Sequence, residues 1–535
     1  TGHVYVDKTA LIYKLLARGK AYFLSRPRRF GKSLLISTVQ AIFEGKRHLF
    51  SGLALENLPY DWSVYPVIRL DLSIIGSVHP SENQPFDLLL KTLIRDIGRK
   101  HTIILDEKGS PGMLFSSLIQ QLGQREGKVV ILVDEYDKPI LNVVHNAQQL
   151  QFVRAIMRDL YSSLKANDQF IRFLFLTGVS EFAQVSIFSG LNHLTKLTFS
   201  QEFGTLLGYT DTEIDQYFGQ HIAAMKKALE ERDLDVRAEL QQMYNGYQFC
   251  KKPPRVYNPY SVMSAFSEKD FSYYWYQTGT PTFLVRLLEE KITDFFELEN
   301  NRYNQNDLSE IILEEKVTQA EKSLSSEYQG RAGADLNPQL MSYPALLYQT
   351  GYWTIDFYDP ADDNYALKIA NKEVREALSR VLSTYVVGRK NAEAARKELA
   401  LVRQYIQSNN LDALKELLII ICSGIPYTIQ KSYNDRSPEC YYQTIFYMIF
   451  WLANLPIQVE TATATGRIDA TLATQTHRYI FEFKIKESAQ DALDQIKSRG
   501  YYRQFLHEPR KIVFIGVKFD LHKRAITEWL TQELE

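Results

Sequence analysis

Eight residues near the N-terminus have the types and spacing of a phosphate-binding loop. They read RPRRFGKS and stand between a short apolar run and an amphipathic stretch. In such a loop the backbone N–H groups at the start of the helix bind phosphate oxygens, the lysine reaches the outer phosphates and the hydroxyl binds Mg²⁺. The sequence therefore predicts an ATP site formed by Arg26, Pro27, Arg28, Arg29, Phe30, Gly31, Lys32 and Ser33, with Ser33 also a metal ligand. The pattern normally begins with glycine, so a surface helix start with solvated arginines is the alternative that this motif alone leaves open.

Acidic and hydroxyl side chains end two other apolar runs in the N-terminal half. Asp134 and Glu135 follow residues 129–133, and Thr177 ends the run over residues 172–177. Because the carboxyl ends of parallel strands meet at one edge of a sheet, these groups are expected beside the phosphate loop. We expect Asp134 to hold the Mg²⁺ shell, Glu135 to act as the catalytic residue that polarises water, and Thr177 to contact the γ-phosphate. A purely structural role is the commoner one for a threonine that ends a strand.

Two segments near the C-terminus alternate apolar and polar residues as the strands of a hairpin would. They cover residues 466–472 and 479–485 on either side of the polar turn 474–477. A turn centred between Gln475 and Thr476 pairs Asp469 with Glu482, Arg467 with Lys484, Ile468 with Phe483, Ala470 with Phe481 and Leu472 with Tyr479. One face is then apolar throughout and the other is mainly polar, which supports this register.

The polar face of this hairpin carries groups that suit metal-dependent hydrolysis. Opposed carboxylates have Cβ atoms about 5 Å apart, which is unfavourable unless a cation lies between them. Asp469 and Glu482 are therefore predicted to bind Mg²⁺, or Mn²⁺, and to be catalytic. Lys484 points to the same face and is predicted to orient the attacking water or stabilise the phosphate. An ordinary hairpin decorated with charged residues remains the alternative.

The elements that must position these residues follow from the spacing of the apolar residues. Apolar runs over residues 21–25, 67–72, 129–134 and 172–177 alternate with amphipathic stretches, the pattern of βα units around a parallel sheet. After residue 210 the chain is mostly helical, with Asp211 expected as the N-cap of a helix over 213–228. The aromatic residues of 244–276 indicate packing of a helical lid more than stacking platforms for bases. A helix over 344–349 and a hairpin over 352–369 have the order of a winged-helix unit, and a second αβ unit follows residue 426.

Length and composition bound the kind of protein. A chain of 535 residues is expected to hold three or four domains, at roughly 150 residues each. Its 62 basic and 63 acidic residues give a net charge of −1, so a basic groove for nucleic acid could exist only locally. The three cysteines lack the spacing of a disulfide framework or zinc site, no long apolar run suits a membrane, and no leader pattern opens the chain. We therefore expect a soluble, cytoplasmic protein.

Several segments together resemble a known family. YVDKTALI, FLSRPRRFGKSLL, VVILVDEYDKP, LTGVSEF, YNGYQF and TGTPTFL are similar to the bacterial AAA-ATPase-like family, which is often fused to a PD-(D/E)XK nuclease domain. An arginine at the first loop position belongs to that family's own pattern, so the resemblance implies ATP binding. Glu181 stands where the family usually has a basic residue, and this departure puts ATP hydrolysis in question.

The C-terminal hairpin resembles the core of the PD-(D/E)XK nucleases. The resemblance rests on G-R-x-D, on E-x-K thirteen residues later, and on the downstream segments ALDQIKSRGY and KIVFIGVKF. It implies that Gln495 and Tyr501 lie on a helix beside the active site. It also makes Glu439 the candidate for a third acid, although an acid in the first turn of a helix often only complements the helix dipole.

The sequence thus predicts an α/β protein: a P-loop NTPase parallel sheet with a helical lid, a winged-helix middle and a C-terminal α/β nuclease fold. The expected boundaries are 1–210, 211–285, 286–385 and 386–535. We expect ATP hydrolysis and metal-dependent cleavage of nucleic acid, with DNA favoured over RNA, and the resemblance implies a role in defence or mobile-element biology. A nucleotide-switched interaction protein without catalysis, and an ATPase that remodels nucleic acid without cutting it, are the alternatives. Assembly into a homo-oligomer stays open.

Overall fold

The computed structural model forms two compact units. Unit 1 consists of Thr1–Gly279 and Leu298–Val374, and unit 2 of Thr280–Glu297 and Arg375–Glu535. The residues that the structure describes are 4–76, 86–106, 108–143, 146–182, 193–252, 254–275, 298, 301–309, 343–387, 392–423, 438–463, 466–520 and 525–534.

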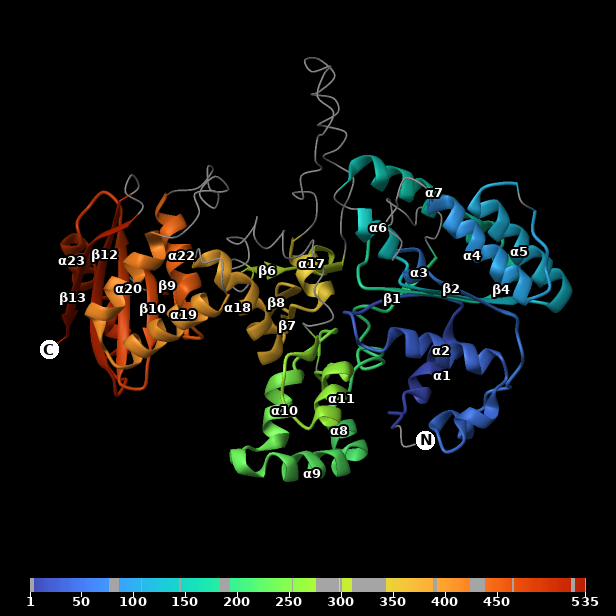
Figure 1. The fold of residues 1–535 in the computed structure, drawn as a ribbon, viewed down its shortest axis with the longest axis horizontal. Helices are drawn as coiled ribbons and strands as arrows, with labels where there is room; N and C mark the ends of the chain where they lie inside the picture. The colour runs from blue at the N-terminus through green and yellow to red at the C-terminus, as the bar shows by residue number, and fades with distance from the viewer. Residues whose placement is uncertain are drawn as a thin grey trace, which may run out of the picture. The chain divides into compact units, whose positions relative to one another are not determined.

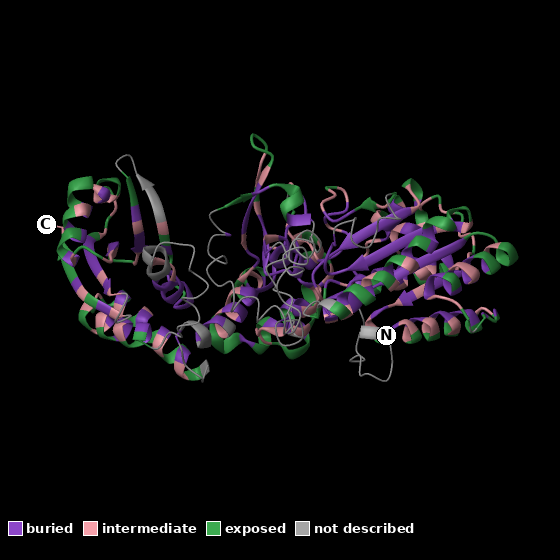
Figure 2. Cartoon of the chain, turned by 90° about the horizontal axis from the view of Figure 1, so that it is seen from above, coloured by how far each residue is buried: buried purple, intermediate pink, exposed green. Residues whose placement is uncertain are grey.

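A five-stranded parallel sheet forms the centre of unit 1 (Figure 1). Its strands are β1 (Ala21–Ser25), β2 (Val67–Asp71), β3 (Val129–Asp134), β4 (Ile171–Gly178) and β5 (Thr195–Lys196). They lie in the order β2-β3-β4-β1-β5, and each neighbouring pair is parallel. Every residue of β1 and β3 is buried, and Figure 2 colours most of this sheet as buried. Nearly continuous apolar runs are typical of strands that helices cover on both faces, and the predicted parallel P-loop sheet is confirmed.

Helices cover both faces of this sheet. Figure 1 shows α1 and α2 on one face and α4, α5 and α7 on the other. The helices of this layer are α1 (Thr9–Arg18), α2 (Lys32–Phe43), α3 (Ser73–Gly76), α4 (Phe86–Lys100), α5 (Pro111–Glu126), α6 (Lys138–Val143) and α7 (Ala147–Ala166). The three-layer arrangement leaves the carboxyl edge of the sheet, where β1 and β3 end, as the place for a ligand.

Helices α8 (Asp211–Tyr217), α9 (Gly219–Ala228), α10 (Val236–Tyr244) and α11 (Pro259–Glu268) follow the sheet and share one apolar core. The single helix predicted over 213–228 is wrong, because the chain breaks between α8 and α9 at Phe218, whose ring is buried in that core. The predicted N-cap Asp211 is also wrong. Thr210 caps α8 because its hydroxyl oxygen accepts the N–H of Glu213. In return, the Glu213 carboxylate accepts the N–H of Thr210.

The aromatic residues that follow this break pack inside unit 1. Tyr244, Tyr247 and Tyr257 are buried, so these side chains serve the core and are not presented as a stacking surface. The packing that the sequence favoured for this segment is confirmed at these three residues.

A helix followed by a hairpin completes unit 1. Helix α17 (Tyr343–Thr350) leads into β7 (Trp353–Asp359) and β8 (Asn364–Ile369), as predicted. A short strand β6 (Arg302–Tyr303) extends the hairpin into a three-stranded sheet in the order β6-β8-β7, and α15 (Gln305–Ser309) follows β6. Helix α18 (Lys372–Val386) begins in unit 1 and continues into unit 2.

Unit 2 is a mixed five-stranded sheet with helices. The helices after α18 are α19 (Ala392–Gln407), α20 (Leu411–Ser423), α22 (Pro438–Leu452) and α23 (Ala489–Arg499). The strands are β9 (Ile457–Thr463), β10 (Gly466–Ala473), β11 (His477–Lys484), β12 (Lys511–Asp520) and β13 (Ala525–Glu533), in the order β13-β12-β11-β10-β9. Only β11 and β12 pair in parallel. The crossover between these two strands contains α23, so this helix lies against the strand that carries Glu482 and Lys484.

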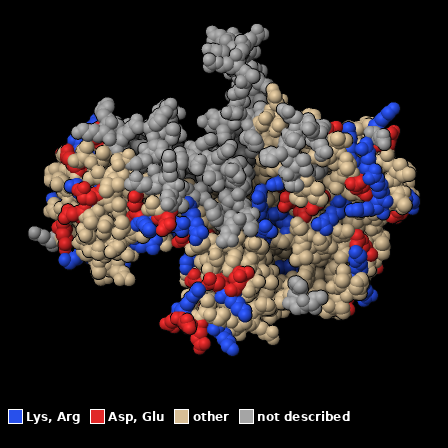
Figure 3. Space-filling view, viewed as in Figure 1, with Lys and Arg blue, Asp and Glu red and all other residues tan. Residues whose placement is uncertain are grey.

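The surface of the described residues mixes both signs of charge. Figure 3 shows basic and acidic side chains interspersed over each unit on the face in view. No helix in the described part of the chain has both the length and the apolar character needed to cross a bilayer.

One buried carboxylate makes the stability of unit 1 depend on pH. Burial raises the pKa of Glu373 from an ordinary 4.5 to about 7. Because the unfolded chain ionises this group near 4.5, the folded state loses stability as pH rises from about 4.5 through 7, by roughly 3 kcal/mol at most. Glu373→Gln should therefore flatten the decline in the unfolding midpoint between pH 5 and pH 8, measured by thermal denaturation of the full chain.

The matched control is Glu376→Gln, one turn further along α18, which should keep the wild-type slope. Equal slopes in wild type and Glu373→Gln would show that Glu373 is already ionised at pH 5.

Candidate active sites

The loop between β1 and α2 has the backbone of a phosphate site. Gly31 adopts φ +91° immediately before α2, and the region that an added Cβ would occupy is open. No side chain caps the N-terminus of α2, so its first-turn N–H groups have no side-chain acceptor. Ser33 lies exposed in that first turn. An anion is the natural partner of this helix end.

Lys32 lies buried within the loop. Its Nζ donates to the carbonyl oxygens of Arg26 and Pro27, at 2.9 and 3.0 Å. Burial lowers the pKa of Lys32, and the nearby carboxylates, Asp137 first, act to raise it. A buried ammonium held only by neutral carbonyls can exchange them for phosphate oxygens, so the loop fits a nucleotide triphosphate.

The ends of β3 and β4 bring the other predicted groups together. Thr177 Oγ1 donates to Asp134 Oδ1 at 3.3 Å, and Arg69 Nη2 lies 4.0 Å from Asp134 Oδ2. Glu135 follows with φ +49°, and its N–H donates to Asp134 Oδ1 at 3.1 Å. Burial raises the pKa of Glu135, while Lys32 lowers it. The arrangement offers hard oxygen ligands for Mg²⁺ and one carboxylate with a raised proton affinity.

Asp137 belongs to this site, although no role was predicted for it. Its Oδ2 accepts the N–H groups of Val179 and Ser180 at 3.0 and 2.7 Å, which fixes the chain after β4. Burial raises its pKa, and Lys32 is its opposite charge. Among the nearby carboxylates, Asp137 does the most to raise the pKa of Lys32. The signal that could have identified it is the run of three acids in DEYD at the end of a buried strand.

Glu181 is buried and paired. Its carboxylate lies 2.8 Å from Lys196 Nζ and accepts Thr198 Oγ1 at 3.1 Å, while its N–H donates to Gln349. The acid that replaces the family's usual basic residue therefore brings its own cation, and it adds no uncompensated negative charge near the loop.

In unit 2 the predicted register of the carboxylate hairpin is confirmed for the two pairs nearest the turn, whereas the predicted pairs Asp469–Glu482, Arg467–Lys484 and Ile468–Phe483 are not part of the ladder. Ala470 pairs with Phe481 and Leu472 with Tyr479. The ladder stops before Asp469, whose Oδ2 accepts the N–H of Phe483 at 2.8 Å. The N–H of Phe483 thus bonds to the Asp469 carboxylate and not to a backbone carbonyl of β10, so the Asp469 side chain points toward β11.

Glu482 lies at the centre of this site. It is buried, and its Oε2 receives no hydrogen bond from any described residue. Lys484 Nζ lies 3.3 Å from Glu482 Oε1 and donates to Gln495 Oε1 at 2.7 Å, while Gln495 Nε2 also donates to Glu482 Oε1. Burial raises the pKa of Glu482, and the Asp469 carboxylate raises it further.

These groups fit a divalent cation. A buried carboxylate oxygen without a donor, next to a second carboxylate, is the donor set of a hard metal ion. Among the described residues no third acid, histidine or cysteine completes a cluster. Glu439 stands in the first turn of α22, but its side chain lies outside the described residues.

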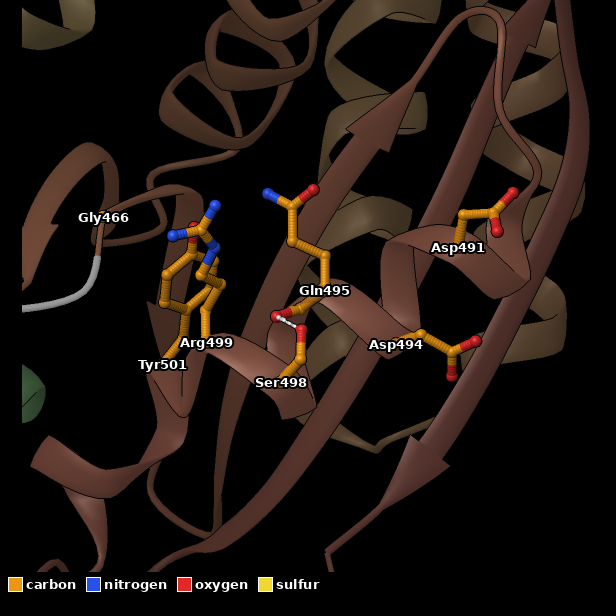
Figure 4. Close-up of a pocket in the computed structure, with 7 residues that line it drawn as sticks. All are labelled: Gly466, Asp491, Asp494, Gln495, Ser498, Arg499 and Tyr501. Atoms are coloured by element: carbon orange, nitrogen blue, oxygen red, sulfur yellow. Dashed lines mark hydrogen bonds between the residues drawn. The ribbon is translucent and has the colours of Figure 1, made fainter.

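A cavity of about 520 Å³ lies beside this site along α23 (Figure 4). Gln495 projects from the helix between its two ends, with Asp491 and Asp494 at one end and Arg499 and Tyr501 at the other. The prediction that Tyr501 lies on the helix is wrong, because Gly500 ends α23 in a left-handed conformation and Tyr501 starts a 3₁₀ turn. Its hydroxyl instead packs toward Gly466 at the start of β10.

Comparison with known proteins supports two assignments. Residues 1–188 match a family model described as a predicted AAA-ATPase, and residues 437–529 match the PD-(D/E)XK nuclease superfamily. A protein of Azotobacter chroococcum mcd 1, named "Uncharacterized protein in vnfD 5'region", is 32% identical over 99% of this chain and 96% of its own length.

Two solved structures from Aeropyrum pernix also match, both at low identity. The Aeropyrum pernix ORC1 protein in complex with DNA matches 70% of this chain and 93% of its own, at 12% identity and a TM-score of 0.27. The Aeropyrum pernix ORC2 protein in its ADP form matches 69% and 91%, at 12% identity and a TM-score of 0.28.

The hairpin site makes a direct prediction about metal binding. Asp469→Asn should weaken Mn²⁺ binding by more than about tenfold, because one of two charged ligands is lost. The affinity is measured by titrating nucleotide-free protein with Mn²⁺ and monitoring the free Mn²⁺ by electron paramagnetic resonance.

The matched control is Asp494→Asn, which removes an acid from the neighbouring cavity. It should leave Mn²⁺ affinity within about twofold of wild type, the change expected for a carboxylate that is not a ligand. Equal affinity in wild type and Asp469→Asn would place the metal elsewhere.

Proposed function

Because this chain belongs to the predicted AAA-ATPase family that carries a PD-(D/E)XK nuclease domain, we propose that it hydrolyses ATP in unit 1 and cleaves nucleic-acid phosphodiester bonds in unit 2. Each activity is argued from its own site. The two are proposed to be linked through one chain, with nucleotide occupancy controlling the nuclease.

The nuclease proposal rests on one observation: the buried, donor-free Oε2 of Glu482 beside Asp469 and Lys484. Asp469 and Glu482 would hold the cation, and Lys484 would orient the attacking water or stabilise charge on the phosphate. A bound Mg²⁺ would supply Lewis-acid polarisation of the scissile phosphate. Gln495 would hold the side chains of Lys484 and Glu482 in place, since its amide oxygen accepts from Lys484 and its amide nitrogen donates to Glu482. DNA is the proposed substrate ahead of RNA.

The ATPase proposal rests on the loop and the acids at the same sheet edge. Lys32 would leave the carbonyl oxygens of Arg26 and Pro27 for the outer phosphates. Ser33 and Asp134 would hold the Mg²⁺ that accompanies ATP, and Thr177 would reach the γ-phosphate. Glu135 would accept a proton from the attacking water, a role that its raised pKa suits.

The nuclease proposal predicts loss of cutting in two variants. Glu482→Gln and Lys484→Met should each lower metal-dependent cleavage of linear single- and double-stranded DNA at least about a hundredfold, since each removes a group that acts on the reacting phosphate or its cation. Cleavage is measured on labelled substrates with Mg²⁺ or Mn²⁺, with and without ATP, beside an RNA of the same sequence.

Lys518→Met is the matched control. Lys518 pairs with Lys484 across β11 and β12 but is held by Glu528 at 3.1 Å, so its loss should leave cleavage unchanged. Metal-dependent cutting that survives Glu482→Gln would contradict the assignment. No cutting by the wild-type chain in any lane would favour a nucleotide-switched interaction protein.

The ATPase proposal predicts a separation of binding from hydrolysis. Lys32→Ala should abolish binding of a fluorescent ATP analogue, because it removes the cation that contacts the outer phosphates. Glu135→Gln should keep binding and lower phosphate release by about a hundredfold or more. Lys165→Ala, at an exposed position in the last turn of α7, should match wild type in both assays. Hydrolysis that is unaffected by Glu135→Gln would remove that residue from the reaction.

A further inference from the structure

One P-loop carbonyl is held by a side chain from far along the chain. The indole Nε1 of Trp275 donates to the carbonyl oxygen of Arg28 at 3.2 Å. The indole is buried and packs edge-on against Tyr352, with ring centroids 5.1 Å apart. This contact joins positions 247 residues apart, so it exists only in the folded unit.

The hydrogen bond fixes the orientation of a loop peptide. In a trans peptide the C=O of one residue and the N–H of the next point in opposite directions. Holding the Arg28 carbonyl toward Trp275 therefore directs the N–H of Arg29 to the other side of the peptide plane. Arg29 itself has φ +67°, and Gly31 has φ +91°, so the loop follows an unusual path that needs support.

Lys32 and Trp275 donate hydrogen bonds to successive carbonyls of the loop. The carbonyls of Arg26 and Pro27 accept from Lys32, and that of Arg28 accepts from Trp275. A phosphate site works through N–H groups, and any carbonyl that turned toward the ligand would repel it. When Lys32 engages phosphate it releases its two carbonyls, whereas the bond from Trp275 does not depend on the ligand. Trp275 is thus a donor from outside the loop, and its bond to the Arg28 carbonyl would not have to break when phosphate binds.

Trp275 is in turn fixed by Glu373. The N–H of Trp275 donates to Glu373 Oε1 at 2.8 Å, and Ser261 Oγ donates to Glu373 Oε2 at 2.7 Å. Glu373 is buried and is the second residue of α18, the helix that continues into unit 2. Two hydrogen bonds therefore connect the P-loop backbone to the first turn of that helix.

We propose that Trp275 and Glu373 are positioning residues of the ATP site, which keep the peptide after Arg28 oriented for phosphate and couple nucleotide binding to the start of α18. The inference rests on the proposed binding of ATP. Because coupling between two sites is reciprocal, ATP must stabilise the first turn of α18 by the same factor by which that turn raises ATP affinity.

Trp275→Phe tests the donor, since it keeps an aromatic ring at this position and removes the N–H together with part of the indole. It should weaken MgATP binding by about three- to tenfold, the factor that corresponds to one net hydrogen bond. Glu373→Ala should weaken binding in the same direction. Glu373→Gln should restore affinity, because its amide can accept from the Trp275 N–H and donate to Ser261. Trp62→Phe is the matched control, since Trp62 packs against Phe50 and Tyr60.

Hydrogen exchange of the full chain distinguishes positioning from general stability. MgATP should slow amide exchange at the start of α18 in wild type and in Trp62→Phe. In Trp275→Phe the exchange rate there should be the same with and without saturating MgATP. If wild type does not bind MgATP, the ATP half of the proposed function fails and this inference fails with it. If wild type binds and both Trp275→Phe and Glu373→Ala bind equally well, only the inference is overturned. Should Trp275→Phe fail to fold, the Glu373→Ala and Glu373→Gln pair decides the same question.

Discussion

A guanidinium group that is removed from water must be stabilised by acceptors and electron-rich groups of the protein, and Arg26 imposes this requirement on unit 1. Its Nη1 donates to the carbonyls of Ser25 and Thr198 at 2.8 and 2.9 Å, and its charge lies 4.2 Å from the centre of the Phe249 ring. Burial lowers the pKa of Arg26 to about 10, so the group is still charged at neutral pH. The loop, the segment after β5 and the segment around Phe249 must all converge on this one side chain.

This constraint explains why arginine can stand where the phosphate-loop pattern usually has glycine. Residue 26 is not among those with positive φ, so its backbone needs no glycine, whereas Gly31 does. The side chain leaves the loop and enters the core. Phe30 does the same, packing edge-on against Tyr247 and Phe249 at 4.8 and 5.4 Å. The loop is therefore supported by two buried side chains of its own, which leaves its backbone N–H groups for the proposed phosphate.

Local patterns in the sequence predicted the elements well, because burial on both faces leaves a direct trace in composition. The strands at Ala21–Ser25 and Val129–Asp134 were predicted to the residue, and the hairpin register followed from alternation around one turn. The break at Phe218 was missed because a buried aromatic residue fits the apolar stripe of a continuous helix equally well. The roles of Asp137 and Trp275 were missed for a different reason. Each acts on backbone groups that are distant in sequence, and no local pattern records such contacts.

The helix before the β7–β8 hairpin shows how far an order of elements can predict a role. In a winged-helix unit that reads DNA, a helix in this neighbourhood must present side chains to a groove. All residues of α17 except Pro344 are buried, and Gln349 bonds to the N–H of Glu181 and to the carbonyls of Leu308 and Ser309. The hairpin turn carries Asp359, Asp362 and Asp363, which would repel phosphates. Helix α17 therefore serves the interior of unit 1 by fixing the chain after β4, and the proposed nucleic-acid contacts must be sought on other surfaces, first around the carboxylates of β10 and β11.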